Sequence, residues 1–551
     1  MLTVGMPDDE SEATQVEVEA RRQGCRLGVE VRYRDENGTA EQTLGESIDD
    51  SAGFVLRLMA ERADIYPDAW EVLEADSRDE STTWRLSLDH VMTTVPFTSQ
   101  PFTSQPFTSQ PFTSQPFTSQ PFTSQPFTSQ PFTSQPFTSQ PFTSQPFTSQ
   151  LALSEYAVPG RGGRAPVQWL ASRPHRESSD GGPTLPGGVA RPVVAIVDSG
   201  IGSHEWFGTY ALDPAETDGA GVVLRDASLP DGPIGTFPVP EFPEEDAEIG
   251  GISTSRLTGP LDPIAGHGTF IAGVVHQKCP DALLLPVRVV GGPGVAIESE
   301  VIESLRRLYR YHQLGLAGEE GFHPVDVVVL SMGYYHEDPD DLQWDHPLSA
   351  VLAQLREAGV AVVAAAGNDG ETRPMYPAAF APEVDRRGAV PRIVCRHDVS
   401  SERPPILTVG ALNPDGTTAL FSNDGPWVTC LRPGAALVSS IPTTLDGPIT
   451  PSVRLKEKHT DGYRTTVDPE GFQGGYATWS GTSFAAPVLA GEIASALIDV
   501  RRARAAQEPA SLGDKRRDDA AAHVSERVRD VWRAITSATN GLTLEESDHP
   551  S

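Results

Sequence analysis

Five short apolar runs in the second half of the chain restrict its fold more than any other feature. They are rich in β-branched residues and almost free of polar ones, which is typical of strands buried on both faces. Patterns with helical spacing stand between them, so strands and helices alternate. This alternation predicts an open, mostly parallel α/β sheet with helices on both faces. The runs are PVVAIVD (192–198), ALLLPVRVV (282–290), VDVVVLSMG (325–333), VAVVAAAGN (360–368) and ILTVGAL (406–412).

A five-residue repeat separates these runs from the N-terminal part. The unit PFTSQ occurs eleven times without change between residues 96 and 150. Proline at every fifth position excludes a continuous helix and interrupts a strand ladder. The block has no charge and too little aliphatic material for a core, so we predict a disordered linker. The alternatives are a binding array, a tract modified on Ser and Thr, or a tether that is cut after its phenylalanines.

The N-terminal part has its own patterning. CRLGVEVRYR (25–34) and TTWRLSLDHV (82–91) favour strands, DENG (35–38) a turn, and SAGFVLRLMAERA (51–63) a helix. We predict a small α+β domain of unknown role and unknown partner. The expected organisation of the whole chain is this domain at 1–95, the repeat linker at 96–150, a Gly- and Pro-rich linker at 151–190, the α/β domain at 191–500 and a polar helical tail at 501–551.

Charge and cysteine usage restrict the class of protein. The formal net charge of −33 argues against nucleic acid or an anionic membrane as partner, because both attract clustered Lys and Arg. The four cysteines are scattered, with no spacing typical of a zinc site or a disulfide framework. We find neither the pattern of a secretory signal nor the roughly eighteen apolar residues of a membrane span. We therefore expect a cytoplasmic protein with reduced thiols.

Three polar residues stand where predicted strands or helices meet loops. Asp198 ends the first apolar run, and Asn368 follows the fourth in a glycine-rich turn. His267 lies between glycines at the start of an apolar helix. Ligands of open α/β sheets collect beyond the carboxyl ends of the strands. Each residue taken alone also fits an ordinary role, because Asp and Asn are common turn residues and many histidines are surface or cap residues.

Ser483 supplies a possible nucleophile for this group. It stands in YATWSGTSFAAPVLAG (476–491), before a run of small apolar residues, where an ordinary helix N-cap is the alternative. A hydroxyl is a weak nucleophile unless a base takes its proton. His267 can be that base, and Asp198 can orient its imidazole. Asn368 and the Ser483 N–H can donate to an oxyanion.

The motifs around these residues resemble those of the subtilisin-like serine proteases, the subtilase family. They are VAIVDSGI (194–201), GHGTFIAGV (266–274), LSMG (330–333), AAAGNDG (364–370) and GTSFAAPVLAG (481–491), in the family's order. The resemblance implies a serine endopeptidase that acts on protein or peptide substrates. It assigns the catalytic triad to Asp198, His267 and Ser483, the oxyanion donor to Asn368, and the strand that pairs with substrate to Ser331, Met332 and Gly333.

The resemblance leaves some features open. Calcium sites are common in the family, but no acidic cluster has a recognisable ligand spacing, so we expect no cofactor and a solvated acidic surface. The acidic stretch 205–262 and the insertion 454–472 are expected to flank the cleft. Residues 1–95 lack a signal and precede two linkers, so we do not expect an ordinary propeptide.

Three alternatives to an active peptidase of this kind are less consistent with the sequence. A pseudoprotease used as a binding module predicts the loss of a catalytic side chain, and none is lost. A repeat-based scaffold or adhesion protein favours a secretion signal or anchor. A related peptidase family with Glu in place of His is disfavoured by the complete GHGT context of His267.

Overall fold

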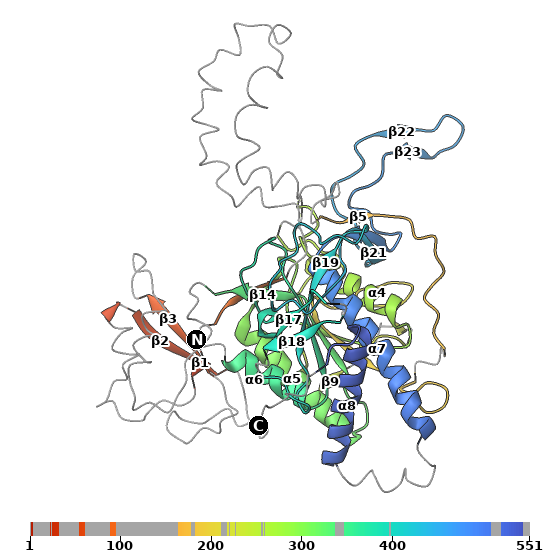
Figure 1. Ribbon diagram of the computed structural model, residues 1–551. Coiled ribbons are helices and arrows are strands. Elements are labelled where there is room, and N and C mark those ends of the chain that lie inside the picture. Colours follow the sequence, from red (N-terminus) through yellow and green to blue (C-terminus); the bar gives the residue numbers. More distant parts are fainter. Residues whose placement is uncertain are drawn as a thin grey trace, which may run out of the picture.

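The structure, a computed structural model, describes most of the second half of the chain (Figure 1). The described residues are 2–3, 22–23, 25–31, 54–60, 89–94 and 163–543, the last range with gaps at 178–181, 211–217, 220, 226, 255–256, 258, 337–345, 389, 396–397 and 508–519. The repeat block, the predicted turn at 35–38 and the first part of the predicted strand at 82–91 lie outside them.

A six-stranded sheet forms the centre of the fold. Its order is β11-β6-β13-β15-β19-β20, and every neighbouring pair is parallel. The predicted parallel α/β fold is therefore confirmed, and each predicted run supplies one strand. The strands are β6 (Val193–Asp198), β11 (Leu283–Arg288), β13 (Val327–Leu330), β15 (Ala361–Ala365), β19 (Ile406–Leu412) and β20 (Cys430–Pro433).

Helices cover both faces of this sheet, as the apolar runs require (Figure 1). Successive strand residues point to opposite faces, so Val194 and Val193 belong to different apolar cores. The first core contains α4 (His267–Lys278) and α7 (Thr482–Gln507), and the second contains α5 (Glu298–Ala317) and α6 (His346–Glu357). Among the described helices, α7 has the length and hydropathy of a membrane span, but 72% of that window is buried, as in a core helix.

The N-terminal part contributes a small antiparallel sheet of β1 (Leu2–Thr3), β2 (Cys25–Val31) and β3 (Phe54–Ala60). The strand predicted at 25–34 is confirmed by β2. The helix predicted at 51–63 is wrong, because β3 pairs with β2 over seven residues. Apolar residues two apart in this segment satisfy a strand as well as a helix, and the pairing with β2 decides between them.

Segments on both sides of the predicted α/β domain pack onto it. β5 (Ala165–Pro166) pairs with β24 (Tyr476–Trp479), and α8 (Ala520–Ala538) buries Val531 and Ile535 against the core of α7. The remaining elements are β7 (Gly208–Thr209), β8 (Asp218–Gly219), β9 (Ser228–Leu229), β10 (Gly232–Pro233), β16 (Met375–Tyr376), β17 (Glu383–Asp385), β18 (Arg392–Cys395), β21 (Leu437–Ser440), β22 (Arg454–Lys456), β23 (Tyr463–Thr465), the 3-10 turns Pro243–Glu245 and Ala378–Phe380, and the groove strands β4, β12 and β14 described below.

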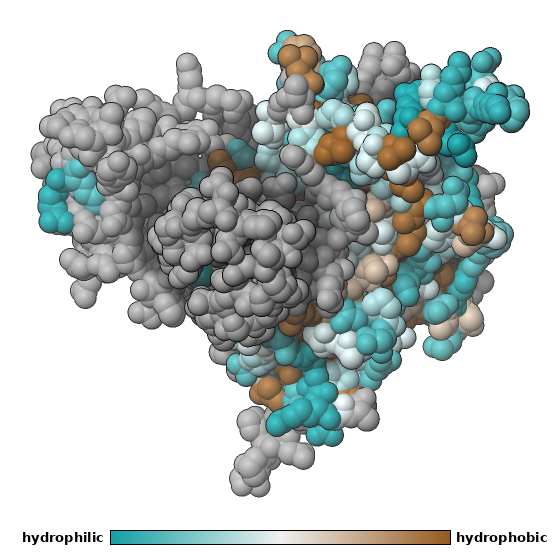
Figure 2. Space-filling view, turned by 90° about the horizontal axis from the view of Figure 1, so that it is seen from above, coloured by the Kyte–Doolittle hydropathy of each residue, from teal (hydrophilic) through white to brown (hydrophobic). Residues whose placement is uncertain are grey.

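The predicted insertion at 454–472 begins as a hairpin of β22 and β23 that projects from the domain (Figure 1). All six strand residues of this hairpin are exposed. Seen from above, the described surface is mainly hydrophilic, with hydrophobic residues in small separate patches (Figure 2).

A buried ion cluster fastens the two C-terminal helices to the sheet. Asp326, which is 2% exposed, precedes β13 and accepts a hydrogen bond of 3.0 Å from the Val193 N–H. It also pairs with Arg501 of α7 and, at 2.7 Å, with Arg527 of α8. Burial alone would raise the pKa of Asp326, but the two guanidinium charges outweigh it and lower the pKa below 3.8.

Replacing Asp326 by Asn is expected to destabilise the fold by about 3–5 kcal/mol, because two guanidinium groups lose their buried counter-charge. Urea unfolding at pH 7 measures this loss. Since the pKa is lowered, the contribution is present above 3.8 and is lost as the pH falls. The difference between wild type and variant should therefore shrink in acid. The exposed pair of Asp385 and Arg387 offers a control, and D385N should leave the midpoint almost unchanged.

Candidate active site

Asp198 and His267 form a buried hydrogen-bonded pair beyond the carboxyl end of β6. His267 Nδ1 lies 2.8 and 3.0 Å from the two carboxylate oxygens of Asp198. Both side chains are fully buried, and Asp198 also accepts a 2.8 Å bond from the Ser199 N–H. His267 is the first residue of α4, and Gly266 before it has a left-handed φ of 80°. The geometry fixes Nδ1 on the carboxylate and leaves Nε2 for other chemistry.

Two glycines allow this pair to form. A Cβ atom on Gly268 would lie 2.1 Å from the carbonyl oxygen of Gly200, so the start of α4 touches the loop after β6 directly. The rings of Trp479 and Phe484 pack around the imidazole of His267, with centroids 5.6 and 5.2 Å away. The imidazole is thus held by its carboxylate on one side and by aromatic rings on another.

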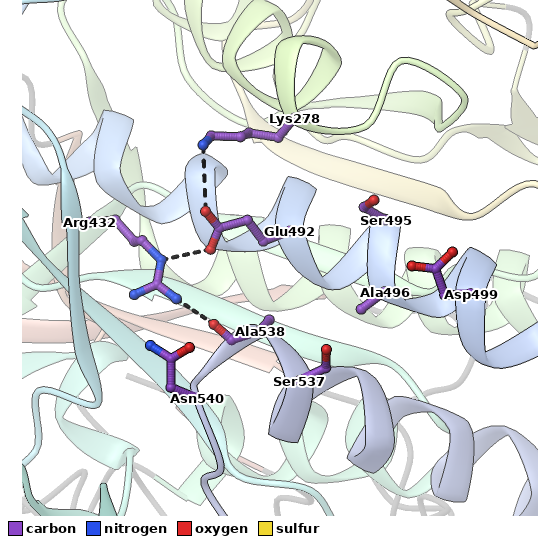
Figure 3. Close-up of a pocket in the computed structure, with 9 residues that line it drawn as sticks. All are labelled: Lys278, Arg432, Glu492, Ser495, Ala496, Asp499, Ser537, Ala538 and Asn540. Carbon is purple, nitrogen blue, oxygen red and sulfur yellow. Dashed lines mark hydrogen bonds and ion pairs between the residues drawn. The ribbon is translucent and has the colours of Figure 1, made fainter. Parts of the chain in front are cut away.

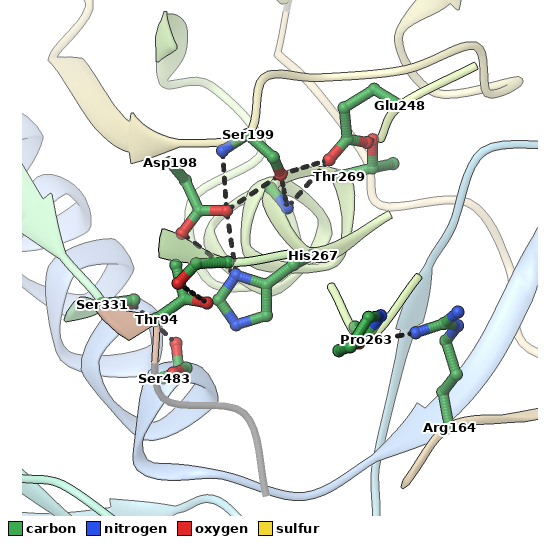
Figure 4. A network of polar contacts seen from close by, with 12 residues as sticks. Thr94, Arg164, Asp198, Ser199, Glu248, Pro263, His267, Thr269, Ser331 and Ser483 are labelled. Atoms are coloured by element: carbon green, nitrogen blue, oxygen red, sulfur yellow. Dashed lines mark hydrogen bonds and ion pairs between the residues drawn. The ribbon is translucent and has the colours of Figure 1, made fainter. Parts of the chain in front are cut away.

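Ser483 is the second residue of α7 and lies beside Asn368 and Ser331. Asn368 Oδ1 accepts bonds of 2.8 and 2.9 Å from the N–H and hydroxyl of Thr482, which attaches the turn after β15 to the helix start. Ser331 Oγ donates to the carbonyl oxygen of Ser483 at 3.1 Å. Figure 4 shows Ser331, Ser483 and the Asp198–His267 pair together. The structure therefore gathers the residues predicted from the sequence.

The proton path between nucleophile and base is not closed by a hydrogen bond. Among the described residues, neither His267 Nε2 nor Ser483 Oγ has a hydrogen-bond partner, and both are buried. Catalytic hydrogen bonds are often long without substrate and shorten in the reacting complex.

Asn423 positions the Asn368 turn and was not found from the sequence. Its Oδ1 accepts a 3.0 Å bond from the Asp369 N–H, and its Nδ2 donates to the Ala366 carbonyl at 3.1 Å. The turn requires Gly367 at a φ of +109°, where a Cβ would lie 2.2 Å from Asn423 Nδ2. Nothing in the local sequence distinguishes Asn423 from an ordinary turn residue.

The strand predicted to pair with substrate is already paired with the chain's own N-terminal part. Met332 and Gly333 belong to β14 (Met332–Tyr335), and Ser331 immediately precedes it. β4 (Val91–Thr94) lies antiparallel between β14 and β12 (Val295–Ile297). Thr94 pairs with Met332, and its N–H donates to the Gly294 carbonyl at 2.9 Å. The Thr94 hydroxyl donates to the same carbonyl at 3.2 Å, and Figure 4 includes Thr94 in one view with His267 and Ser483.

The residues around β4 hold it between β12 and β14. Met92 is 1% exposed and belongs to the apolar core on the α5 face, whereas Val91 is 61% exposed. The Asp89 carboxylate accepts two 2.8 Å bonds from the N–H and hydroxyl of Ser299, in the first turn of α5. His90 Nδ1 lies 2.7 Å from Glu298 Oε2. A carboxylate at a helix N-terminus is favourable because the helix dipole is positive there.

Glu248 is a second buried carboxylate beside the Asp198–His267 pair (Figure 4). Its Oε1 lies 2.5 Å from Ser199 Oγ, and its Oε2 accepts the hydroxyl of Thr269. Burial, assisted by the charges of Asp198 and Asp246, raises the pKa of Glu248 from 4.5 to about 8, although the hydroxyl bonds oppose the shift. Glu248 lies in the stretch expected to be solvated acidic surface. No spacing in that stretch distinguishes it from its neighbours.

Among the described residues there is no group of three or more His, Cys, Asp or Glu side chains that could hold a metal ion. A surface pocket lies elsewhere, between α4, α7 and α8 (Figure 3). Three of its charged groups are paired with one another, since Glu492 lies 3.5 Å from Lys278 and 2.7 Å from Arg432. It contains none of the predicted site residues.

The sequence pattern of the subtilase family matches residues 190–513, and the chain therefore belongs to this family. Serine protease AprX of Bacillus subtilis (strain 168) is 27% identical over 265 residues, covering 43% of this chain and 49% of AprX. The human membrane-bound transcription factor site-1 protease is 28% identical over 258 residues, covering 46% of this chain and 19% of that protein.

Solved structures also match. A cold-adapted subtilisin-like serine proteinase shares 17% sequence identity at a TM-score of 0.31, covering 69% of this chain and 95% of that chain. Among the curated relatives, this chain spans about half the length of AprX and about a fifth of the site-1 protease.

Replacing Gly268 by Ala is expected to push the start of α4 away from Gly200, because backbone atoms cannot move aside as a side chain can. Overpacking of this kind costs about 1–3 kcal/mol. Urea unfolding measures the loss, and the NMR resonance of the His267 Nδ1 proton reports the altered pair. Gly474 is the matched control, because a Cβ there meets nothing within 4 Å. An unchanged His267 resonance in G268A would contradict the argument.

Proposed function

We propose that this subtilase-family chain is a serine endopeptidase that hydrolyses peptide bonds through an acyl-enzyme intermediate. Ser483 is its nucleophile, His267 its general base, and Asp198 the carboxylate that orients the imidazole. The observation that supports this most is the buried contact of 2.8 Å between His267 Nδ1 and Asp198, beside Ser483 at the start of α7. The two relatives named above are both called proteases, which agrees with this proposal.

In the proposed mechanism His267 acts in turn as base and as acid. His267 Nε2 takes the Ser483 proton as Oγ attacks the carbonyl carbon, and Asp198 stabilises the imidazolium that forms. His267 then gives the proton to the leaving amine, and a water molecule attacks the acyl-enzyme with His267 again as base.

Two donors stabilise the tetrahedral oxyanion in this proposal. Because Asn368 Oδ1 is occupied by Thr482, the amide nitrogen is the part of Asn368 that donates to the oxyanion. The Ser483 N–H joins it, since N–H groups of a first helical turn have no intrahelical acceptor and lie at the positive end of the dipole. Substrate is bound as an extended strand against Ser331, Met332 and Gly333.

The peptidase is latent while β4 occupies its groove. β4 makes the antiparallel pairing with β14 that an extended substrate requires, so substrate and β4 compete for the same backbone groups. The expectation that residues 1–95 are not an ordinary propeptide does not account for this pairing, whereas a segment that occupies the position of substrate does. Release of β4 is then a condition for activity.

Location and partners are further parts of the proposal. A cytoplasmic location agrees with the free thiols of Cys279 and Cys430. Protein substrates, rather than nucleic acid, agree with the net charge of −33. Cleavage of the repeat after phenylalanine stays a prediction, and intact mass of the protein and its Ser483→Ala form would reveal fragments spaced by five residues.

Replacing Ser483 by Ala is expected to abolish peptide hydrolysis and labelling by a fluorophosphonate probe, because both need the Oγ nucleophile. Circular dichroism and the unfolding midpoint should be unchanged. Ser480 is a matched control three residues away, since it also lies at the helix entrance but bonds the Ala436 N–H instead. Labelling that persists in S483A, or disappears in S480A with the fold intact, contradicts the assignment.

Replacing Met92 by Asp is expected to release β4, because the variant loses a buried apolar side chain and would bury a carboxylate. The apolar part alone is worth about 1.5–3 kcal/mol, which corresponds to a roughly ten- to hundredfold larger open population. The initial rate of fluorophosphonate labelling of the full chain measures this population. Val91→Asp is the control on the same strand, because Val91 is 61% exposed. Equal rates in M92D and wild type would exclude β4 as the barrier.

A further inference from the structure

We propose that Glu248 is a positioning residue that carries a proton in the resting enzyme and thereby directs the Ser199 hydroxyl onto Asp198. This inference rests on the proposed function, because it concerns how the Asp198–His267 pair is held ready for catalysis. Glu248 is fully buried and comes from the loop between β10 and α4. None of the steps described above uses it.

The geometry around Ser199 provides the evidence. Its Oγ has one proton but two carboxylate acceptors, Asp198 Oδ1 at 3.0 Å and Glu248 Oε1 at 2.5 Å. The Gly268 N–H donates to Ser199 Oγ at 3.0 Å. The Ser199 hydroxyl can donate to only one carboxylate at a time. Which one it chooses depends on the protonation state of Glu248.

The two protonation states give two hydrogen-bond arrangements. When Glu248 is protonated, its O–H donates to Ser199 Oγ, and the Ser199 hydroxyl donates to Asp198. When Glu248 is ionised, it accepts the Ser199 hydroxyl, and Asp198 loses that donor. The Gly268 N–H, 3.1 Å from Oε1, and the Thr269 hydroxyl bond to Glu248 in both states. Only the two bonds of the Ser199 hydroxyl therefore change: the one to Glu248 reverses its direction, and the one to Asp198 is present only when Glu248 is protonated.

The charges around Glu248 favour the protonated state at neutral pH. Asp198 faces it from β6, and Asp246 from its own loop accepts the Glu248 N–H at 2.8 Å. Arg288 of β11 has the opposite charge but is already paired with Asp246 at 2.7 Å. The remaining ionisable neighbours from other elements are His267 of α4, Tyr210 and the guanidinium of Arg164. Two carboxylates and burial thus oppose a third negative charge, in agreement with the pKa of about 8 given above.

Ionisation of Glu248 has a predictable effect on catalysis. It places a second carboxylate charge one hydroxyl away from Asp198 and removes one hydrogen bond from that carboxylate. Both changes favour the imidazolium form of His267, so the imidazole returns its proton to the leaving amine less readily. The turnover number should therefore fall as the pH rises past 8, whereas binding of substrate to β14 should not change.

The first experiment follows the His267 Nδ1 proton by NMR in the full chain between pH 6 and pH 10. In wild type its chemical shift should show a step with a midpoint near pH 8, in addition to any step from the imidazole itself. Glu248→Gln should lack this step, because its amide donates to Ser199 at every pH. Ser199→Ala should reduce the step, since only the charge effect remains. A wild-type protein without the step, or an E248Q variant that keeps it, overturns the proposal.

A matched control separates this network from burial in general. Glu303 on α5 is a half-buried glutamate, with a pKa raised to about 7 by burial, and it lies on the other face of the sheet. Glu303→Gln should keep the His267 step unchanged. This NMR measurement needs no peptidase activity, so its failure is distinguishable from failure of the proposed function.

The second experiment measures kcat and KM for an extended peptide in the Met92→Asp background. If only the protonated state of Glu248 supports turnover, kcat should fall about tenfold from its plateau by pH 9, one unit above the pKa. With E248Q added, the fall should disappear and KM should follow the same pH course in both. A fall in kcat that persists with E248Q overturns the catalytic part of the proposal.

Discussion

The parallel pairing of the six central strands is the constraint on which the site depends. Parallel strands all end at one edge of the sheet, so residues far apart in the chain become neighbours there. Asp198 ends β6, Ser331 follows β13 and Asn368 comes shortly after β15. α4 and α7 then begin at this edge with His267 and Ser483 in their first turns. Hydrogen-bond register and helix direction therefore bring together the residues proposed as nucleophile, base and oxyanion donors.

The parts of the fold and site that could be predicted are those whose signal is local. A strand buried on both faces must be apolar along its whole length, which made β6 and β13 recognisable. Asp198, His267 and Ser483 each stand at an abrupt change from apolar residues to glycine or serine. The physical reason is close backbone approach, as between Gly200 and Gly268, and small residues mark such contacts in the sequence itself.

The parts that could not be predicted depend on contacts between distant segments. Glu248 has the same sequence surroundings as exposed glutamates, and only the fold buries it against Ser199. Asn423 reaches the turn after β15 from a separate loop. β4 ends next to the repeat, and its place between β12 and β14 follows from backbone hydrogen bonds that almost any sequence can make. Likewise, β3 was mistaken for a helix because its partner strand decides its conformation.

The ion cluster at Asp326 affects how the peptidase part can be separated from the rest of the chain. A fragment that ends at residue 500, where the apolar pattern of α7 fades, would lack both Arg501 and Arg527. It would keep a buried carboxylate at the base of β13 with no cation to neutralise it. Strand β13 leads directly to Ser331 and β14. The C-terminal helices are thus an integral part of the α/β domain, and a fragment that keeps this ion cluster has to extend through α8.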